Sequence, residues 1–225
     1  MRALDIAAAG MAAQQTRVEV ISNNLANLST TGYSPRRAEF ADLSYQQVVR
    51  PGTVAASDGT LVPAGVQLGL GVRATAVTVM LQQGALSATG NDLDVAIEGD
   101  GFLEVRLPDG RSAYTRDGAL KLTGDGLLVT SDGYAVVPEI TVPPDARSVT
   151  ITPEGEVLAQ FGDRVAPESL GALTLTGFAN AKGLESIGSN LALETEASGP
   201  PLTSAPGQDG LGTLRQGYLE ESAVD

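Results

Sequence analysis

The chain has 225 residues, 42% of them hydrophobic, which is enough apolar material for the core of one or two domains. Its 14 basic and 27 acidic side chains give a net charge of −13, which disfavours nucleic acid and anionic membrane surfaces as partners. Cysteine and histidine are absent, so disulfides, thiolate nucleophiles, imidazole bases and Cys/His metal sites are excluded. No apolar run is long enough to span a bilayer and the N-terminus lacks a signal-peptide pattern, so we expect no membrane insertion and no cleaved signal peptide.

Residues 1–30 carry a heptad pattern typical of a helix that pairs with other helices. One set of heptad positions holds Leu4, Met11, Val18 and Leu25, and the set three residues later holds Ala7, Gln14, Ile21 and Leu28. All but Gln14 are apolar, and good helix formers without proline fill the interior. We therefore predict an assembly seam formed by Leu4, Ala7, Met11, Val18, Ile21, Leu25 and Leu28.

So narrow a stripe cannot bury itself, and no other segment offers a second helix of this length and period. We expect the partner outside this chain, in other copies or in a C-terminal extension. The alternative is an ordinary core helix that packs on its own domain. The many alanines favour close approach to another helix over docking on a sheet.

The helix pattern ends in a stretch rich in Asn, Ser and Thr, closed by Gly32 and Pro35. Residues 36–49 have weak helical spacing, with apolar side chains at Phe40, Leu43 and Val48. Residues 51–71 are rich in Gly, Ser, Thr and Ala and resemble a loop, whereas residues 72–78 alternate as a strand does.

From Asn91 the apolar residues recur with period two, which is typical of strands. The alternating groups are Leu93-Val95-Ile97, Leu103-Val105-Leu107, Leu120-Leu122, Leu128-Val129, Val149-Ile151, Val157-Ala159-Phe161 and Leu173-Leu175. With turn signals between them, about eight short strands predict an antiparallel domain of sandwich or barrel type. The fold class is thus mainly β, with one long N-terminal α-helix.

The C-terminal part continues this pattern less regularly. Residues 196–212 are predicted to be irregular and extended, and residues 213–220 to form a short strand. Residues 221–225 look like the approach to a helix, with Ser222 or Asp225 as its N-cap.

The sequence offers little that points to catalysis. A nucleophile elbow, a phosphate-binding loop and a zinc-protease motif are all absent. Asp92, Asp94, Glu98 and Asp100 form the densest acidic cluster, but their order does not fit a calcium loop, and a solvated strand face explains them better. We expect no enzyme activity, no cofactor and no metal.

Several stretches resemble one known family. The run Ile21 to Asn27 followed by Thr31-Gly32-Tyr33 resembles the N-terminal signature of bacterial flagellar rod and hook proteins. The resemblance continues in order at Gly90 to Phe102, Tyr114 to Gly118 and Gln216 to Glu220, and covers the chain essentially end to end. Its motif after the helix is Ser22, Asn23, Asn24, Asn27 and Gly32.

Two features depart from the family pattern. Leu103 stands where a second aromatic usually follows Phe102. The family ends in a long C-terminal heptad helix, and this chain stops where that helix is expected to begin.

The resemblance implies a self-assembling structural subunit of a helical filament in the flagellar basal body, where the rod crosses the periplasm and transmits torque from motor to hook. It divides the chain into an assembly helix (1–33), a connecting stalk with an extended loop (34–90), an antiparallel β-domain (91–199) and a return segment (200–225). The implied partners are other copies, neighbouring proximal rod, hook and ring proteins, and the flagellar type III export apparatus.

Length and the stretch from Leu43 to Gln46 leading to Arg50-Pro51-Gly52 favour the distal rod. A proximal rod or hook position is the first alternative. The second, from another class, is an extracellular glycan-binding β-domain, which a positive peptidoglycan-binding assay would support.

Overall fold

The computed structural model describes residues 2–49, 65–162 and 166–224. The chain forms two compact units: unit 1 comprises Met1–Leu25 and Arg36–Val79, and unit 2 comprises Ala26–Pro35 and Met80–Asp225. The chain therefore passes from one unit to the other after Leu25, after Pro35 and after Val79.

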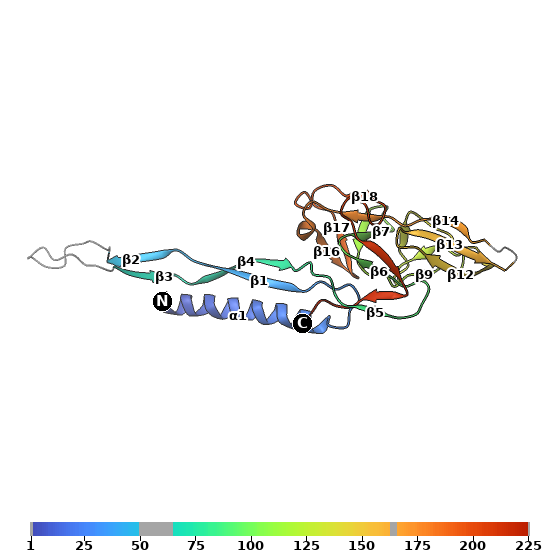
Figure 1. Cartoon of the computed structure of the whole chain (residues 1–225). Coiled ribbons are helices and arrows are strands. Elements are labelled where there is room, and N and C mark those ends of the chain that lie inside the picture. The colour runs from blue at the N-terminus through green and yellow to red at the C-terminus, as the bar shows by residue number, and fades with distance from the viewer. Residues whose placement is uncertain (1, 50–64, 163–165, 225) are drawn as a thin grey trace, which may run out of the picture. The chain divides into compact units, whose positions relative to one another are not determined.

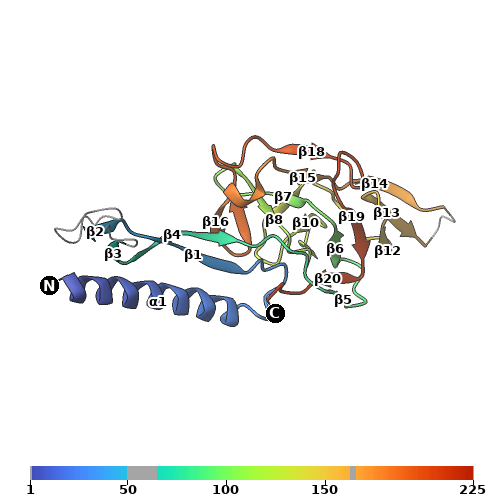
Figure 2. The same cartoon turned by 60° about the vertical axis from the view of Figure 1, so that its left-hand side comes forward.

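Unit 1 combines one long helix with an extended antiparallel ribbon (Figure 1). Helix α1 spans Arg2–Ala26. In the ribbon, β1 (Arg36–Asp42) pairs with β4 (Val72–Val79), and β2 (Tyr45–Val49) pairs with β3 (Val66–Gly69). The ribbon runs beside the helix in both views (Figures 1 and 2).

The predicted helix is confirmed, but two expectations for the ribbon are wrong. The weak helical spacing in residues 36–49 belongs to β1 and β2, and residues 66–69, expected in a loop, form β3. Strand β1 shows no period-two pattern because its register with β4 shifts between Glu39 and Phe40, and a bulge of this kind breaks the alternation of side chains. The rest of the expected loop, with Arg50, lies in residues 50–64, outside the described residues.

Unit 2 is built from short antiparallel strands. The largest sheet has the order β16-β17-β8-β7-β11-β10-β9, and β15 pairs with both β7 and β18. A three-stranded sheet (β12-β13-β14) and the pairs β19-β6 and β20-β5 complete the described part of the unit. The strands are β5 (Leu86–Ala88), β6 (Val95–Glu98), β7 (Phe102–Arg106), β8 (Ser112–Thr115), β9 (Lys121–Leu122), β10 (Leu128–Val129), β11 (Ala135–Val137), β12 (Ala146–Ile151), β13 (Glu156–Phe161), β14 (Glu168–Ala172), β15 (Leu175–Gly177), β16 (Glu185–Gly188), β17 (Leu191–Leu193), β18 (Leu202–Ser204), β19 (Thr213–Gln216) and β20 (Tyr218–Glu220), with one 3₁₀ turn, η1 (Ala181–Gly183).

One cluster of aliphatic side chains forms the core of unit 2. It includes Val95, Ile97, Leu103, Val105, Leu107, Leu120, Leu128, Val136, Val157, Leu173 and Leu175. Most of these positions are the ones that the period-two pattern assigned to the interior. Leu103 is fully buried, so a branched aliphatic side chain fills the place where an aromatic was expected.

The predicted antiparallel β-domain is confirmed, although the main sheet does not close into a barrel. Sequence reasoning found only some of the strands and misplaced others. Leu173 is buried outside any strand, and the single strand expected over residues 213–220 is two, interrupted at Gly217. Gly217 has φ +76°, and its N–H donates to Asp94 O at 2.7 Å.

Residues 202–204, within the segment expected to be irregular, form β18. Among the described residues, no helix combines the length and the apolar character needed to cross a bilayer.

Candidate assembly helix and its anchoring junction

Helix α1 leaves its predicted seam uncovered. The exposed fractions of the large seam side chains are 72% for Leu4, 67% for Met11, 60% for Val18, 55% for Ile21, 67% for Leu25 and 48% for Leu28. Ala7 is exposed as well. Single exposed apolar residues are ordinary, but a row that recurs every three and four residues is typical of a helix side that packs on a partner. Leu28 lies beyond the last residue of α1, so the helical seam is one position shorter than the pattern predicts.

The other side of α1 packs on the ribbon of unit 1. Ala13 is 7% exposed, and a Cβ atom placed on Gly71 would lie 3.3 Å from Ala9 Cβ. The small side chains of Ala9 and Ala13 therefore let the helix approach the strands closely. The alanines were expected to favour packing of α1 on another helix over packing on a sheet. That expectation is wrong for Ala9 and Ala13, which lie on the side of α1 that packs on the ribbon. At about 100° per residue, Ala13 lies about 140° around the helix from Val18, so the packed side and the seam face different directions.

Asn24 fastens the end of α1 to β1 within unit 1. Its Nδ2 donates to Arg36 O at 2.8 Å, and Arg36 N donates to Asn24 Oδ1 at 3.0 Å. The side-chain amide thus acts as a neighbouring strand would, offering one donor and one acceptor. Two further motif residues, Ser22 and Asn23, are exposed on the last turns of the helix.

The turn after the helix, in unit 2, is closed by Asn27. Thr30 N donates to Asn27 O at 3.1 Å, and Thr30 Oγ1 donates to Asn27 Oδ1 at 3.1 Å. Asn, Ser and Thr side chains compete for backbone hydrogen bonds in this way, which explains why the helix does not continue through residues 27–30.

Gly32 is the point at which this turn meets the β-domain. It has φ +64°, and its N–H donates to Glu220 O at 2.8 Å. A Cβ atom here would lie 2.9 Å from the carbonyl carbon of Arg116, so no side chain fits. Next to it, Asn190 Nδ2 donates to Thr31 O at 3.1 Å, from the turn between β16 and β17.

Beneath Gly32, Arg116 and Glu220 form a buried ion pair. Arg116 Nε donates to Glu220 Oε2 at 2.9 Å, and the side chains are only 11% and 4% exposed. The guanidinium also donates to Gly101 O and Gly99 O, both at 3.1 Å. Gly84 N donates to the second carboxylate oxygen at 2.9 Å. Both charges are thus hydrogen-bonded, which a buried ion pair needs if it is to be stable.

Three chain segments of unit 2 run together at this junction, which we define as residues 31–35, 80–85 and 220–223. Met80 N donates to Pro35 O at 2.8 Å, Glu221 N donates to Ala85 O at 2.8 Å, and Ala223 N donates to Tyr33 O at 3.1 Å. Two of the segments adjoin the points where the chain passes between units. The junction therefore ties those chain crossings to the β-domain by backbone and ionic contacts.

Three residues of the acidic cluster, Asp92, Glu98 and Asp100, are exposed as expected, but the fourth is not. Asp94 is buried and accepts hydrogen bonds from Thr89 Oγ1 at 2.6 Å and Asn91 Nδ2 at 2.9 Å. The expectation that Asp94 faces solvent is therefore wrong, since its carboxylate organises the turn that precedes β6. In the parts of the chain that the structure describes, no three acidic side chains gather closely enough to hold a metal ion.

Asp117, beside the junction, has a raised pKa. Burial is the largest cause, and hydrogen bonds to its carboxylate from the Ala119 N–H and the Asn190 side chain oppose it. The nearby carboxylates of Asp132 and Asp94 raise the pKa further.

Comparison with known proteins connects these features. The model described as "Flagella basal body rod protein" matches residues 4–33, and the model "Flagellar hook protein FlgE/F/G D1 domain" matches residues 96–159. The flagellar basal-body rod protein FlgG of Caulobacter vibrioides is 48% identical over 225 residues, which cover 100% of this chain and 86% of that protein. FlgG of Borreliella burgdorferi is 47% identical over 226 residues, covering 100% and 85%, and FlgG of Bacillus subtilis is 36% identical over 230 residues, covering 100% and 86%.

The chain belongs to the flagellar basal-body rod protein family. It is a structural rod subunit, and its place is the basal body of the flagellum. The matched range 4–33 of this rod subunit contains the whole predicted seam and the motif from Ser22 to Gly32. The matched range 96–159 falls in the β-domain that holds Arg116.

Sequence reasoning missed the ion pair and the role of Asn190. Arg116 and Glu220 both lie in stretches that resemble the family, but a single sequence gives no signal that pairs residues so far apart. For Asn190, the adjoining Gly188-Ser189 indicated a turn, yet nothing indicated what that turn contacts.

Proposed function

We propose that the chain builds the distal rod by self-assembly through the exposed seam of α1, and that the junction passes torque from the helix to the β-domain. The observation that carries this proposal is the uncovered heptad row from Leu4 to Leu25 on a helix whose other side is packed. Apolar rows of this kind are buried against neighbouring helices in assemblies. A contact that joins different faces of two copies extends without closing, which gives a filament.

A subunit under torque must resist deformation where its parts are joined. The junction supplies a fully hydrogen-bonded buried ion pair, a glycine contact with no room for a side chain, and backbone bonds between three segments. None of these features needs catalysis, so we propose that the chain is not an enzyme. Neighbouring rod, hook and ring proteins and the type III export apparatus are its proposed partners.

The test places an aspartate on the seam and compares it with an aspartate elsewhere on the same helix. Val18→Asp is expected to abolish sedimentable polymer, because burying an unpaired carboxylate between helices is strongly unfavourable. Ala12→Asp is the matched control: Ala12 is also exposed, but lies about 120° around the helix from Val18. Far-UV circular dichroism checks that both variants fold.

The control variant should polymerise as the parent chain does. Polymer formed equally well by Val18→Asp would refute the role given to the seam. Loss of polymer in both variants would show that α1 tolerates no added charge and that the seam has no special part.

A further inference from the structure

The heptad row of α1 contains one polar position, Gln14. It belongs to the same heptad set as Ala7 and Ile21, and its side chain is exposed. Among the described residues its side-chain amide has no hydrogen-bond partner. The neighbouring Gln15 lies outside both heptad sets and donates from Nε2 to Glu19 Oε1 at 3.0 Å. The amide of Gln15 is thus used within the helix, whereas that of Gln14 is not.

Burial of the seam takes the Gln14 amide out of water. A buried amide without a hydrogen-bond partner destabilises the contact that buries it, whereas an amide that faces another polar group largely escapes this cost. In coiled coils, a single polar residue in an apolar heptad row fixes the register of the helices at some cost in stability. Gln14 therefore penalises every arrangement that places it against an apolar side chain.

A second copy of α1 offers Gln14 the partner that it needs. The seam positions carry no charge, and unit 1 holds 6 basic and 5 acidic residues, so two copies of it meet without strong repulsion. When two copies lie parallel and level, each apolar seam residue faces its own counterpart and Gln14 faces Gln14. A shift by one heptad places Gln14 against Ala7 or Ile21 and buries two amides unpaired.

The amide group also suits a contact that repeats from copy to copy. It has N–H donors and a carbonyl acceptor, so Gln14 can donate to the next copy and accept from the previous one. The contact then joins different atoms of two copies and does not have to close. A filament built by repeating one contact points every copy of α1 the same way along its axis, as the parallel arrangement requires.

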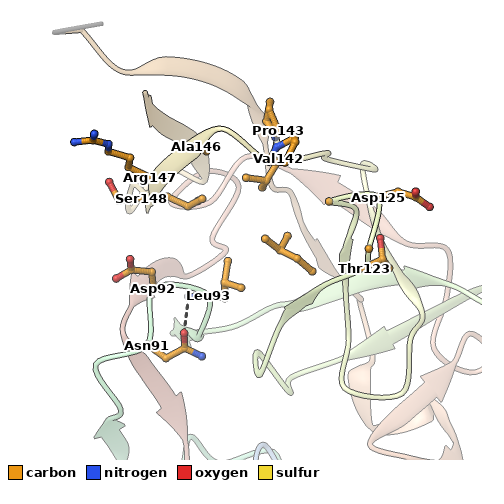
Figure 3. Close-up of a pocket in the computed structure, with 15 residues that line it drawn as sticks. Asn91, Asp92, Leu93, Thr123, Asp125, Val142, Pro143, Ala146, Arg147 and Ser148 are labelled. Atoms are coloured by element: carbon orange, nitrogen blue, oxygen red, sulfur yellow. Dashed lines mark hydrogen bonds between the residues drawn. The ribbon is translucent and has the colours of Figure 1, made fainter. Parts of the chain in front are cut away.

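A hollow of about 560 Å³ in unit 2 shows the contrast. Apolar side chains such as Leu93 and Val142 line it, and the exposed side chains of Asp92, Asp125 and Arg147 lie at its margin (Figure 3). Because water can reach these charges however a neighbour is oriented, a slipped contact leaves none of them buried and unpaired. Such a hollow does not discriminate between registers as a buried amide does.

We propose that Gln14 is the specificity-determining residue of the seam, and that its side-chain amide hydrogen-bonds to Gln14 of neighbouring copies and holds their α1 helices parallel and level. The inference rests on the proposed function, since it assigns a role to one position of the surface through which the copies assemble. Strength and specificity are then separate properties: the apolar side chains supply the association, and the amide selects the register.

The absence of cysteine allows the register to be measured by disulfide cross-linking. Copies of the full chain with Met11→Cys are mixed with copies carrying Val18→Cys, assembled under reducing conditions and then mildly oxidised. Level copies link two residues of the same number, whereas copies shifted by one heptad link position 11 to position 18, and mass spectrometry distinguishes these products. We expect mixed links to be about tenfold rarer than same-position links, because the shift buries two amides unpaired.

Three substitutions, each made in both copies, test whether the amide is responsible. Gln14→Leu should raise the mixed links about tenfold, to the frequency of the same-position links, while the polymer still sediments. Gln14→Asn keeps an amide at this position and should keep the pattern of the parent chain. Gln15→Leu is the matched control, because it makes the same change one residue away and outside both heptad sets, and it should keep that pattern as well.

Mixed links that stay rare in Gln14→Leu would overturn the proposal, as would mixed links that are already as common as same-position links in the parent polymer. Loss of sedimentable polymer in Gln14→Leu would overturn it too, because the amide would then be needed for association itself. A polymer that sediments but links at neither position would refute the seam contact, and with it the proposed function. Links without preference for a register, in a polymer that sediments, would remove only the role of Gln14.

Discussion

The buried ion pair gives the sharpest test of how unit 2 is held together. In the variant Glu220→Ala, the guanidinium of Arg116 stays buried and keeps only the two carbonyl oxygens of Gly99 and Gly101. The N–H of Gly84 also loses its acceptor. Both groups lie away from solvent, so water does not replace the hydrogen bonds that they lose.

Removing one partner of a buried ion pair costs about 3–5 kcal/mol of the free energy of unfolding. The matched control is the exposed pair of Arg106 and Glu139, 3.3 Å apart with side chains 55% and 48% exposed. Glu139→Ala should lower the free energy of unfolding by less than about 1 kcal/mol, since water screens that pair. Replacing Arg116 and Glu220 together by leucine should cost less than Glu220→Ala, because no lone charge stays buried.

Urea unfolding followed by far-UV circular dichroism measures these differences from the transition midpoints of parent and variants. The expected order of destabilisation is Glu220→Ala first, the double leucine variant second and Glu139→Ala last. If Glu220→Ala and Glu139→Ala proved equally mild, Glu220 would be solvated in the native protein and the junction would not be held by charge.

Two further predictions concern the same junction. Gly32→Ala should lower the free energy of unfolding by about 1–3 kcal/mol, and by more than Gly110→Ala does. Both glycines have positive φ, but only a Cβ atom on Gly32 would lie 2.9 Å from a backbone carbonyl carbon, that of Arg116. Equal urea midpoints for the two variants would contradict the close contact. Asp117→Asn should make the protein more stable than the parent at pH 7, because burial raises the pKa of Asp117 above 3.8 and the folded state therefore prefers the neutral form. That advantage is full above the folded-state pKa and should disappear below the ordinary value of 3.8, so a stability difference that does not change with pH would refute it.

Periodicity predicted the parts of the fold whose side chains alternate strictly between interior and solvent. The groups at Leu103-Val105-Leu107 and Val157-Ala159 were placed correctly because each strand has one buried face. Strands β1 to β3 of the ribbon were not, because the ribbon has no fully buried face among its described residues. Strand β16, exposed along its whole length, gave no signal for the same reason. The alternation over residues 72–78 did indicate a strand, which is confirmed as β4.

The exposed apolar row of α1 could be predicted from the sequence, whereas the contacts of the junction could not. The apolar row of a helix follows from local spacing, so Leu4, Met11 and Val18 indicate it without any tertiary contact. The part of this row in assembly stays a prediction. The junction depends on residues such as Arg116 and Glu220, which are polar and are joined only by the path of the chain between them. Their local sequence is compatible equally with a solvated turn.

The two units differ in net charge, and this difference favours contacts between copies through the helix of unit 1 over contacts through unit 2. Unit 1 holds 6 basic and 5 acidic residues, so it is nearly neutral, whereas unit 2 holds 8 basic and 22 acidic residues. Copies of unit 2 therefore repel one another over a range of about 8 Å at physiological salt, while the apolar seam of α1 meets no comparable repulsion. Any contact between β-domains must place an opposite charge at a defined point to overcome this field.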